Sequence, residues 1–587
     1  MTRENFQVNL RGIVEILSHH LYSSPRVYLR ELIQNARDAV VARRALDPTA
    51  PIGIEIEVDQ YGGEVIVRDE GIGLSEDEMR SLLATIGASS KRGEFLAARR
   101  QYLGQFGIGL LSCFLIADEI EVRSRSARGE DAPTVTWLGS ADGTYTVRRA
   151  EQPLDRPGTE VRVRARVDDR EWVGYQRVHL LAEQFASLID LPVVLRAAGT
   201  PERSLVSTRT PPWAMDEESA AWWCRQQLGF TPLAVLPVEV QAAGVRGVAY
   251  IADSPGRVGN RRGDVVHSHG MFVAADNTQL TPHWAFFVQL AVEAGELGLT
   301  ASRESLQDGE LLGQVREQIG VQIRAQIERL AERDPLAFAR FLEVHDKGLL
   351  AMAVHDREML DFVVRHLRWE TSEGPLTLHR IFRTRGGAQY VTGMAAFSAF
   401  APLMRARGTV LVNGGYVYGA EILRLVEEDR TRYRGLEPFS VEGLLRELPH
   451  PSGADSDLAA RIRAHAEPVL SRLGMGLELR SFEPDSIPVL AIGLSGGFEV
   501  EDAEEPDPWA GFAEEFVTTP RGPRIVFNLQ SPPVRALAGD MDARVRSEAI
   551  TGLYVLGLLM AGESIDERHS ELLSGTLRTL IEAATGG

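Results

Sequence analysis

The stretch Glu31-Leu-Ile-Gln-Asn35-Ala-Arg-Asp38 decides the fold of the first part of this chain. Its carboxylate, amide and second carboxylate are spaced i, i+4 and i+7, which places all three on one face of an α-helix. The helix is otherwise apolar, with Leu29, Leu32, Ile33, Ala36, Ala39 and Val40. Polar groups that point inward from such a buried helix must be hydrogen-bonded, bind a metal or face a cavity. The pattern is typical of a nucleotide site.

A second segment, Asp69-Glu-Gly71-Ile-Gly73, follows a predicted β-hairpin at residues 52–68. Glycines let the backbone approach a ligand closely, and a carboxylate there can accept a hydrogen bond from the exocyclic amine of adenine. Taken alone, an ordinary turn with an exposed Asp explains these five residues better.

A third segment, Gly104-Gln-Phe-Gly107-Ile-Gly109, precedes the apolar residues 110–117, which we expect to be helical. Glycines before a helix N-terminus expose backbone N–H groups that suit phosphate oxygens. Taken alone, the cluster is equally compatible with a plain loop.

Length and composition indicate a folded protein of several domains. The 587 residues exceed one core and predict about three or four domains. A net charge of −19 argues against a large nucleic-acid interface. Two cysteines, Cys113 and Cys224, build no disulfide framework or zinc cluster. With no signal segment and no apolar run near the roughly 20 residues of a membrane span, we expect a cytoplasmic protein that binds neither nucleic acid nor membrane.

Strand and helix patterns divide the chain into three expected domains, residues 1–199, 200–454 and 455–587. In the first, strands are expected after the hairpin at 119–125, 145–149 and 160–166, a closing helix at 176–189 and a linker at 196–212. The second has expected strands at 248–252 and 409–412 and a helix at 311–331. The third ends in two amphipathic helices, 542–560 and 567–583, of a kind that often pair with another copy.

The three motifs occur in this order in one group of proteins, the ATPases that include gyrase, heat-shock protein 90, histidine kinases and MutL. Within the group the chain resembles the heat-shock protein 90 family over most of its length. Phe6-Gln-Val, the segment from Tyr28 to Ala39 and Gly158-Thr159 are similar to family signatures. The most discriminating match, Leu299-Thr-Ala-Ser302-Arg303-Glu304-Ser-Leu-Gln307, resembles a middle-domain catalytic loop that the sister families lack.

This resemblance implies an α+β protein. Its expected parts are an N-terminal Bergerat (GHKL) ATPase sandwich of helices on a mixed sheet, an α/β middle domain and an α+β C-terminal dimerisation domain. Val526-Phe-Asn-Leu-Gln and the two terminal helices resemble the last of these.

The resemblance also implies ATP hydrolysis with Mg²⁺ and assigns roles to residues. Glu31 would polarise the attacking water, Asn35 would offer its carbonyl oxygen to Mg²⁺, and Arg303, assisted by Gln307, would contact the γ-phosphate. Asp38 would orient its neighbours or reach adenine through water. The remaining nucleotide contacts are expected from Arg30, Asp69, Gly73, Leu74, Lys91, Gly104, Gln105, Phe106, Gly107, Ile108, Gly109 and Thr159.

The expected lid over the nucleotide, residues 75–101, departs from the family pattern. Ala88 stands where a nucleotide-contacting Lys is expected, Leu82 replaces a polar contact and Leu110 replaces an aromatic one. Lys91 could reach the phosphates from its shifted position. The lack of a long charged linker and of an acidic tail resembles the bacterial members of the family.

The implied function is a chaperone: a homodimer that uses ATP to open and close around unfolded or metastable client proteins. Trp509, Phe512 and Phe516, spaced i, i+3 and i+7 beside an acidic loop, are candidate client contacts, although this spacing also fits a core. A histidine kinase does not fit because no phosphoacceptor helix precedes Asn35, and a topoisomerase does not fit because its acidic metal cluster and tyrosine are missing. A nucleotide-regulated binding scaffold with negligible hydrolysis stays open because the lid is altered.

Overall fold

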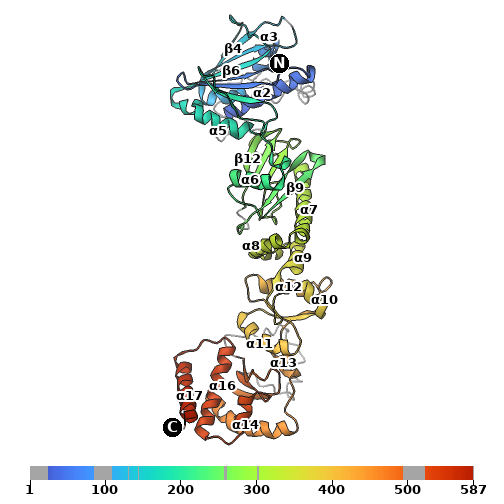
Figure 1. Ribbon diagram of the computed structural model, residues 1–587, viewed down its shortest axis with the longest axis vertical. Helices are drawn as coiled ribbons and strands as arrows, with labels where there is room; N and C mark the ends of the chain where they lie inside the picture. Colours follow the sequence, from blue (N-terminus) through green and yellow to red (C-terminus); the bar gives the residue numbers. More distant parts are fainter. Residues whose placement is uncertain are drawn as a thin grey trace, which may run out of the picture. The chain divides into compact units, whose positions relative to one another are not determined.

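The computed structural model describes residues 24–84, 109–129, 131–142, 144–256, 261–300, 303–493 and 522–585. These form two compact units, residues 1–341 and 342–587 (Figure 1). The finer division into three domains at 199/200 and 454/455 stays a prediction.

An eight-stranded mixed sheet covered by helices begins the first unit (Figure 1). The strand order is β5-β4-β3-β6-β2-β1-β7-β8, and β1 and β7 form its parallel pair. The strands are β1 (Ile54–Asp59), β2 (Glu64–Asp69), β3 (Ala117–Arg125), β4 (Val135–Ser140), β5 (Tyr145–Arg149), β6 (Gly158–Ala165), β7 (Val193–Ala197) and β8 (Ser204–Leu205). The helices are α2 (Val27–Leu46), α3 (Glu76–Ala84), α5 (Tyr175–Ala186) and the 3₁₀ segments η2 (Leu110–Leu115) and η3 (Val167–Val173). The predicted layer of helices on a mixed sheet is confirmed.

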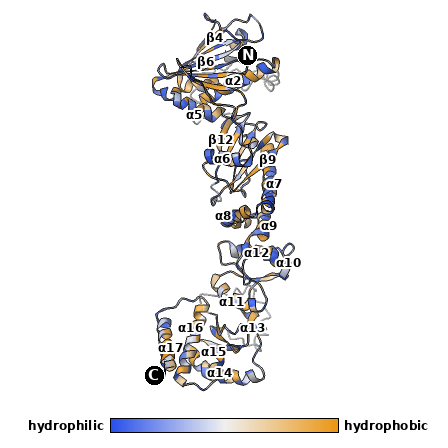
Figure 2. Ribbon diagram, viewed as in Figure 1, coloured by the Kyte–Doolittle hydropathy of each residue, from blue (hydrophilic) through white to orange (hydrophobic). Residues whose placement is uncertain are grey.

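Alternation along the strands explains which face is covered. In β1, Ile54, Ile56 and Val58 are buried in one core with the apolar residues of α2 and α5, whereas Glu55 and Glu57 point to the opposite face. Figure 2 shows that both hydrophobic and hydrophilic residues occur along these strands and α2. The apolar residues of α2 therefore pack on this face of the sheet.

Two predictions for this region were wrong in detail. The expected linker at 196–212 contains the end of β7 and all of β8, because β7 pairs in parallel with β1, a long-range contact that composition does not reveal. The apolar residues 110–117 form the short 3₁₀ helix η2 and not an α-helix, and β3 already begins at Ala117. The strand β4 was not anticipated.

A five-stranded sheet of order β12-β11-β13-β10-β9 follows within the first unit. Its elements are η4 (Pro212–Ala214), α6 (Glu217–Gln227), β9 (Ala234–Val240), η5 (Gln241–Ala243), β10 (Val245–Ile251), β11 (Asp264–Ser268), β12 (Met271–Asn277), β13 (Val288–Ala294) and α7 (Glu310–Arg333). Side chains of α7 cover the edge strand β9: Gln322 bonds both the N–H (2.9 Å) and the C=O (2.6 Å) of Glu239, and Gln326 donates to the C=O of Pro237.

The second unit contains two small three-stranded sheets. One has the parallel order β17-β16-β18, and the other has the order β19-β21-β20. Its strands are β14 (Arg368–Trp369), β15 (Leu376–Thr377), β16 (Ala388–Val391), β17 (Leu411–Asn413), β18 (Leu436–Pro438), β19 (Gly476–Arg480), β20 (Val489–Ile492) and β21 (Arg524–Asn528). Its helices are α9 (Arg357–His366), α10 (Leu378–Arg385), α11 (Met394–Ala406), α12 (Gly419–Glu428), α13 (Val441–Glu447), α14 (Ala454–Arg472), α15 (Pro532–Ala536), α16 (Ala543–Met560) and α17 (Glu567–Thr585). The helix α8 (Pro335–Ala353) crosses the division between the units.

The two predicted terminal helices are confirmed as α16 and α17, which pack against each other. Within the described ranges, no helix combines the length and the apolar character that crossing a membrane requires.

Candidate active site

The helix α2 carries two buried charged residues beside its apolar face. Arg30 and Glu31 are 3 % and 2 % exposed, and they stand among the buried residues Val27, Leu29 and Leu32. An ionised carboxylate at such a position must be paired, because removal from water without a partner costs several kcal/mol. The partners of Glu31 therefore decide what this residue can do.

Both carboxylate oxygens of Glu31 accept hydrogen bonds from arginines. Arg30 donates from Nε (3.2 Å) and Nη2 (2.9 Å) to Oε1. Arg303 donates from Nη1 to Oε2 at 2.9 Å. Gly109, the last glycine of the third motif, lies against the same carboxylate: a Cβ at this position would stand 2.5 Å from Oε2. The absence of a side chain at Gly109 thus leaves room for the Glu31 carboxylate.

Arg303 reaches α2 from the tip of a tight turn. The turn is closed by a bridge between Leu299 and Leu306, and the Arg303 N–H donates to the Thr300 carbonyl at 2.9 Å. Arg303 has φ +56°, a backbone conformation that residues other than glycine rarely adopt outside functional or tightly constrained sites. Its guanidinium also donates from Nη1 to the side chain of Gln34 at 2.7 Å.

Gln307, expected to assist Arg303, lies elsewhere in the described structure. Its N–H donates to the Gly298 carbonyl at 2.7 Å, and its exposed side chain stands beside Gly298. The loop thus brings Arg303 to Glu31 and does not bring Gln307 there.

The end of β2 gathers the residues expected at the adenine. Asp69 accepts from the Gly71 N–H (2.8 Å), and burial raises the pKa of its carboxyl to about 7. Thr159 is the cross-strand partner of Asp69. Gly73 has φ +61°, and a Cβ there would stand 2.0 Å from the Arg125 carbonyl oxygen, so only glycine fits this turn.

Ser124 joins these groups and was missed from the sequence. This fully buried residue accepts from the Leu74 N–H at 2.8 Å and lies 3.0 Å from the Thr159 hydroxyl and from the Gly158 carbonyl. Its only sequence signal is a small polar residue at an inward position of the predicted strand 119–125. Asp69, Gly73, Leu74 and Thr159 are brought together around it.

Asn35 and Asp38 continue the stripe of α2. The side chain of Asn35 is half-buried and makes no hydrogen bond to any residue that the structure describes, so its amide is available to a ligand. Asp38 accepts from Arg37 Nη1 at 3.1 Å. Burial raises the pKa of Asp38, and the positive charges of Arg37 and Arg303 act in the opposite direction.

Several expected contacts lie outside the described residues. These are Phe6 of the first strand, Ala88, Lys91, Gly104, Gln105, Phe106, Gly107, Ile108 and the client candidates Trp509, Phe512 and Phe516. Of the lid residues 75–101, the backbone to Ala84 is described. Among the described side chains, no three His, Cys, Asp or Glu converge as they would around a metal. The expected Mg²⁺ ligand remains Asn35 with phosphate and water oxygens.

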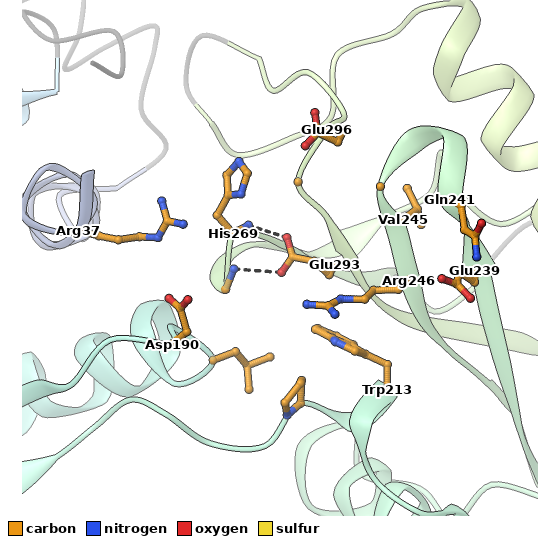
Figure 3. Close-up of a pocket in the computed structure, with 15 residues that line it drawn as sticks. Arg37, Asp190, Trp213, Glu239, Gln241, Val245, Arg246, His269, Glu293 and Glu296 are labelled. Carbon is orange, nitrogen blue, oxygen red and sulfur yellow. Dashed lines mark hydrogen bonds between the residues drawn. The ribbon is translucent and has the colours of Figure 1, made fainter. Parts of the chain in front are cut away.

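A separate cavity of about 520 Å³ opens beside Arg37, between α2 and the second sheet (Figure 3). On its floor, Arg246 of β10 stands in register between Glu239 and Glu293 of the flanking strands. Glu293 accepts from the N–H groups of His269 (2.5 Å) and Gly270 (3.0 Å). No residue predicted to bind nucleotide lines this cavity, so it is distinct from the candidate active site.

Comparisons with known proteins agree with the motifs. The family model "Histidine kinase-, DNA gyrase B-, and HSP90-like ATPase" matches residues 22–158. The chain is 29 % identical to "Chaperone protein HtpG" of Gluconobacter oxydans (strain 621H), over 69 % of this chain and 71 % of that protein. It is 24 % identical to "Chaperone protein HtpG" of Chlorobium luteolum, over 99 % and 97 %, and 25 % identical to "Heat shock protein 75 kDa, mitochondrial" of Rattus norvegicus, over 64 % and 56 %. The match to the mitochondrial protein spans less than two thirds of that relative.

Proposed function

We propose that this chain, which belongs to the heat-shock protein 90 family, is an ATP-dependent molecular chaperone that hydrolyses ATP to open and close a dimer around unfolded or metastable client proteins. The chaperone activity is supported by the names of the HtpG relatives and by the match to the ATPase family model. The cytoplasm of a bacterium is the compartment that this relationship suggests. One observation carries the catalytic part of the proposal: Arg303, 272 positions from Glu31, donates a hydrogen bond to that carboxylate.

The proposed reaction assigns a role to six of the described residues, which are Glu31, Asn35, Asp69, Gly73, Gly109 and Arg303. Asp69 would accept a hydrogen bond from the adenine amine, while Gly73 and Gly109 keep the backbone close to the ligand. Asn35 would hold Mg²⁺, which neutralises phosphate charge when ATP is bound. Glu31 would polarise the attacking water, and the Arg303 guanidinium would stabilise the charge that develops on the transferred phosphoryl group.

In the proposed reaction the described arrangement would be a resting one. Both oxygens of Glu31 accept hydrogen bonds from guanidinium groups, and a carboxylate that is relieved of one of these cations is a stronger base for the attacking water. Arg303 is the partner that can leave, because Arg30 directly precedes Glu31 in α2 whereas Arg303 is carried by a separate turn. If the Arg303 guanidinium moved from Glu31 to the nucleotide, two things would happen at once. Glu31 would become available as a base, and Arg303 would reach the phosphate that it is proposed to stabilise. Such a rearrangement makes turnover slow.

The dimer is supported by the terminal helices of the second unit. Leu556 and Leu559 on α16 and Leu577 and Ile581 on α17 are exposed apolar side chains, and Ile581 reaches 61 % exposure. Leucines at such spacing on paired terminal helices suit a second copy of the same surface. A species of twice the chain mass in light scattering at micromolar concentration supports the dimer, and a monomer with and without nucleotide contradicts it.

Hydrolysis is tested with Glu31→Ala. We expect magnesium-dependent ATP turnover in the wild type and a loss of about 100-fold or more in the variant, because a positioned acid–base group contributes on this scale. The ATP dissociation constant, measured by calorimetry, should change little. Glu119→Ala, which removes an exposed carboxylate from β3, is the matched control with unchanged turnover. If the wild type binds ATP but turns over no faster than Glu31→Ala, the scaffold hypothesis replaces the enzyme.

A further inference from the structure

Gln34 is a polar residue of α2 that has no role in the proposed reaction as described so far. It lies one helical turn after Glu31, and residues spaced i, i+3 share a face of a helix. The same atom of Arg303, Nη1, donates to Gln34 Oε1 at 2.7 Å and to Glu31 Oε2 at 2.9 Å. The guanidinium from the distant turn is therefore held by two acceptors on the helix and not by the carboxylate alone.

The two acceptors differ in charge and in what else they can do. Glu31 is a buried carboxylate, and in the proposed reaction it exchanges Arg303 for the attacking water. The amide of Gln34 is neutral and half-buried, does not titrate and takes no part in proton transfer. When Glu31 exchanges Arg303 for water, the hydrogen bond from Arg303 to Gln34 can therefore persist.

The turn that carries Arg303 needs such an anchor. Arg303 adopts a left-handed backbone conformation, which is unfavourable for a residue other than glycine unless surrounding contacts hold it. The described hydrogen bond between its main chain and α2 is a weak one, from Arg30 Nη1 to the Arg303 carbonyl at 3.5 Å. The hydrogen bond from Arg303 Nη1 to Gln34 Oε1 is much shorter, at 2.7 Å, and it holds the end of the Arg303 side chain.

We infer that Gln34 is a positioning residue that keeps the Arg303 guanidinium on α2 while the Glu31 carboxylate exchanges Arg303 for the attacking water. This role rests on the proposed ATP hydrolysis and adds a residue to it. Gln34 acts through Arg303 and does not touch the nucleotide. Its removal therefore lowers the rate of the catalytic step and leaves the binding of ATP unchanged.

The test compares Gln34→Ala with Gln60→Ala, a matched change at an exposed glutamine in the turn between β1 and β2. In Gln34→Ala we expect kcat to fall about 10-fold, the scale of one hydrogen bond to a charged group, with KM for ATP within about twofold. Gln60→Ala should match the wild type in both constants. An unchanged kcat in Gln34→Ala overturns the inference.

The double variant separates positioning from an independent effect. If Gln34 acts through Arg303, the variant with both Gln34→Ala and Arg303→Ala should be no slower than Arg303→Ala alone. Losses that multiply would mean that Gln34 contributes elsewhere and would overturn the role.

A second measurement keeps the inference distinct from the proposed function. The Arg303 and Gln307 N–H groups are hydrogen-bonded within the turn, so their hydrogen exchange reports how firmly the turn is held. Exchange several-fold faster in Gln34→Ala than in the wild type and Gln60→Ala supports the anchor even if no ATP turnover is found. Equal exchange in all three proteins overturns it. An absence of turnover in the wild type contradicts the proposed function alone.

Discussion

The first unit holds two clusters of arginine and glutamate that differ in how their members are shared. In the candidate site, the single carboxylate of Glu31 serves Arg30 and Arg303. On the opposite face of the sheet, the single guanidinium of Arg68 serves Glu160 at 2.7 Å, Glu57 at 2.8 Å and Glu55 at 3.3 Å. One cluster has a shared acceptor and the other a shared donor.

The outer cluster is redundant. Arg196 also binds Glu55 (3.0 Å) and Glu57, while Arg123 and Arg162 both bind Glu160 at 3.3 Å. All its members stand on neighbouring strands whose register is fixed by the sheet. Loss of one arginine leaves each carboxylate a second partner. The cluster stabilises the sheet face without depending on any one pair.

The site cluster is not redundant in this sense. Arg303 approaches from a turn far away in sequence, and the described first domain supplies no other cation at Oε2 of Glu31. The contact can therefore form or break as a unit when the turn moves. The comparison teaches that the number of ion pairs in a cluster is a poor guide to function. A better guide is one carboxylate shared between a partner on its own helix, here Arg30, and a partner from a distant turn, here Arg303.

The largest expected effect comes from Arg303→Ala. We expect kcat for ATP hydrolysis to fall on the order of 10³-fold, because a guanidinium that meets the transferred phosphoryl group contributes at least this much in comparable enzymes. The affinity for ATP should change little. Arg68→Ala, which removes an arginine from the outer cluster, should leave kcat unchanged. Equal effects of the two changes in a steady-state ATPase assay would remove the distinction between the clusters.

An intermediate effect is expected from Asp69→Asn, measured as adenosine binding by calorimetry. Loss of a hydrogen bond to a charged group should weaken binding roughly 10- to 100-fold at pH 8. Burial raises the pKa of Asp69 to about 7, so the wild-type carboxyl gains a proton as the pH falls below that value and becomes a weaker acceptor. Wild-type affinity should therefore fall between pH 8 and pH 6, whereas the variant should bind equally at both. Adenosine carries no phosphate, so a pH dependence that persists in Asp69→Asn would exclude Asp69 as its cause.

The smallest effect concerns stability. Arg68→Ala should lower the free energy of unfolding by less than about 1 kcal/mol, because each of the three carboxylates that Arg68 pairs with keeps a second arginine partner. The difference from the wild type should shrink further in 1 M salt, where charges are screened. Denaturant titration at low and high salt measures both values. A loss of several kcal/mol would show that the outer cluster depends on Arg68 after all.

The sequence predicted local structure where one periodic pattern was enough. The 3.6-residue period around Glu31 gave the buried helix, and the alternation of Ile54, Ile56 and Val58 gave the hairpin that delivers Asp69. It did not predict β7 and β8, because β7 pairs with β1 across more than 130 residues, as in the register of Ile54 with Val193, and β8 in turn pairs with β7. Composition made those residues look like a linker.

For the candidate site too, the sequence predicted the residues of one local pattern and did not predict the long-range contacts. Glu31, Asn35 and Asp38 follow from helix geometry, but Arg303 came from a family resemblance, since nothing in the residues between them records the contact. Gln34 and Ser124 were missed because a glutamine or serine inside an element carries no signal of its own. Their roles depend on which atoms meet in the folded chain.

The glutamines of α7 that cover β9 have a consequence for a protein that handles unfolded chains. An uncovered strand edge offers its N–H and C=O groups to any extended polypeptide, and such an edge would bind clients without discrimination or join copies of the protein into aggregates. With Gln322 and Gln326 satisfying those groups, this border of the sheet is closed to added strands. Under the proposed chaperone function, an extended client would then find no free backbone ladder at β9, and its release from this border would require no strand to be peeled away.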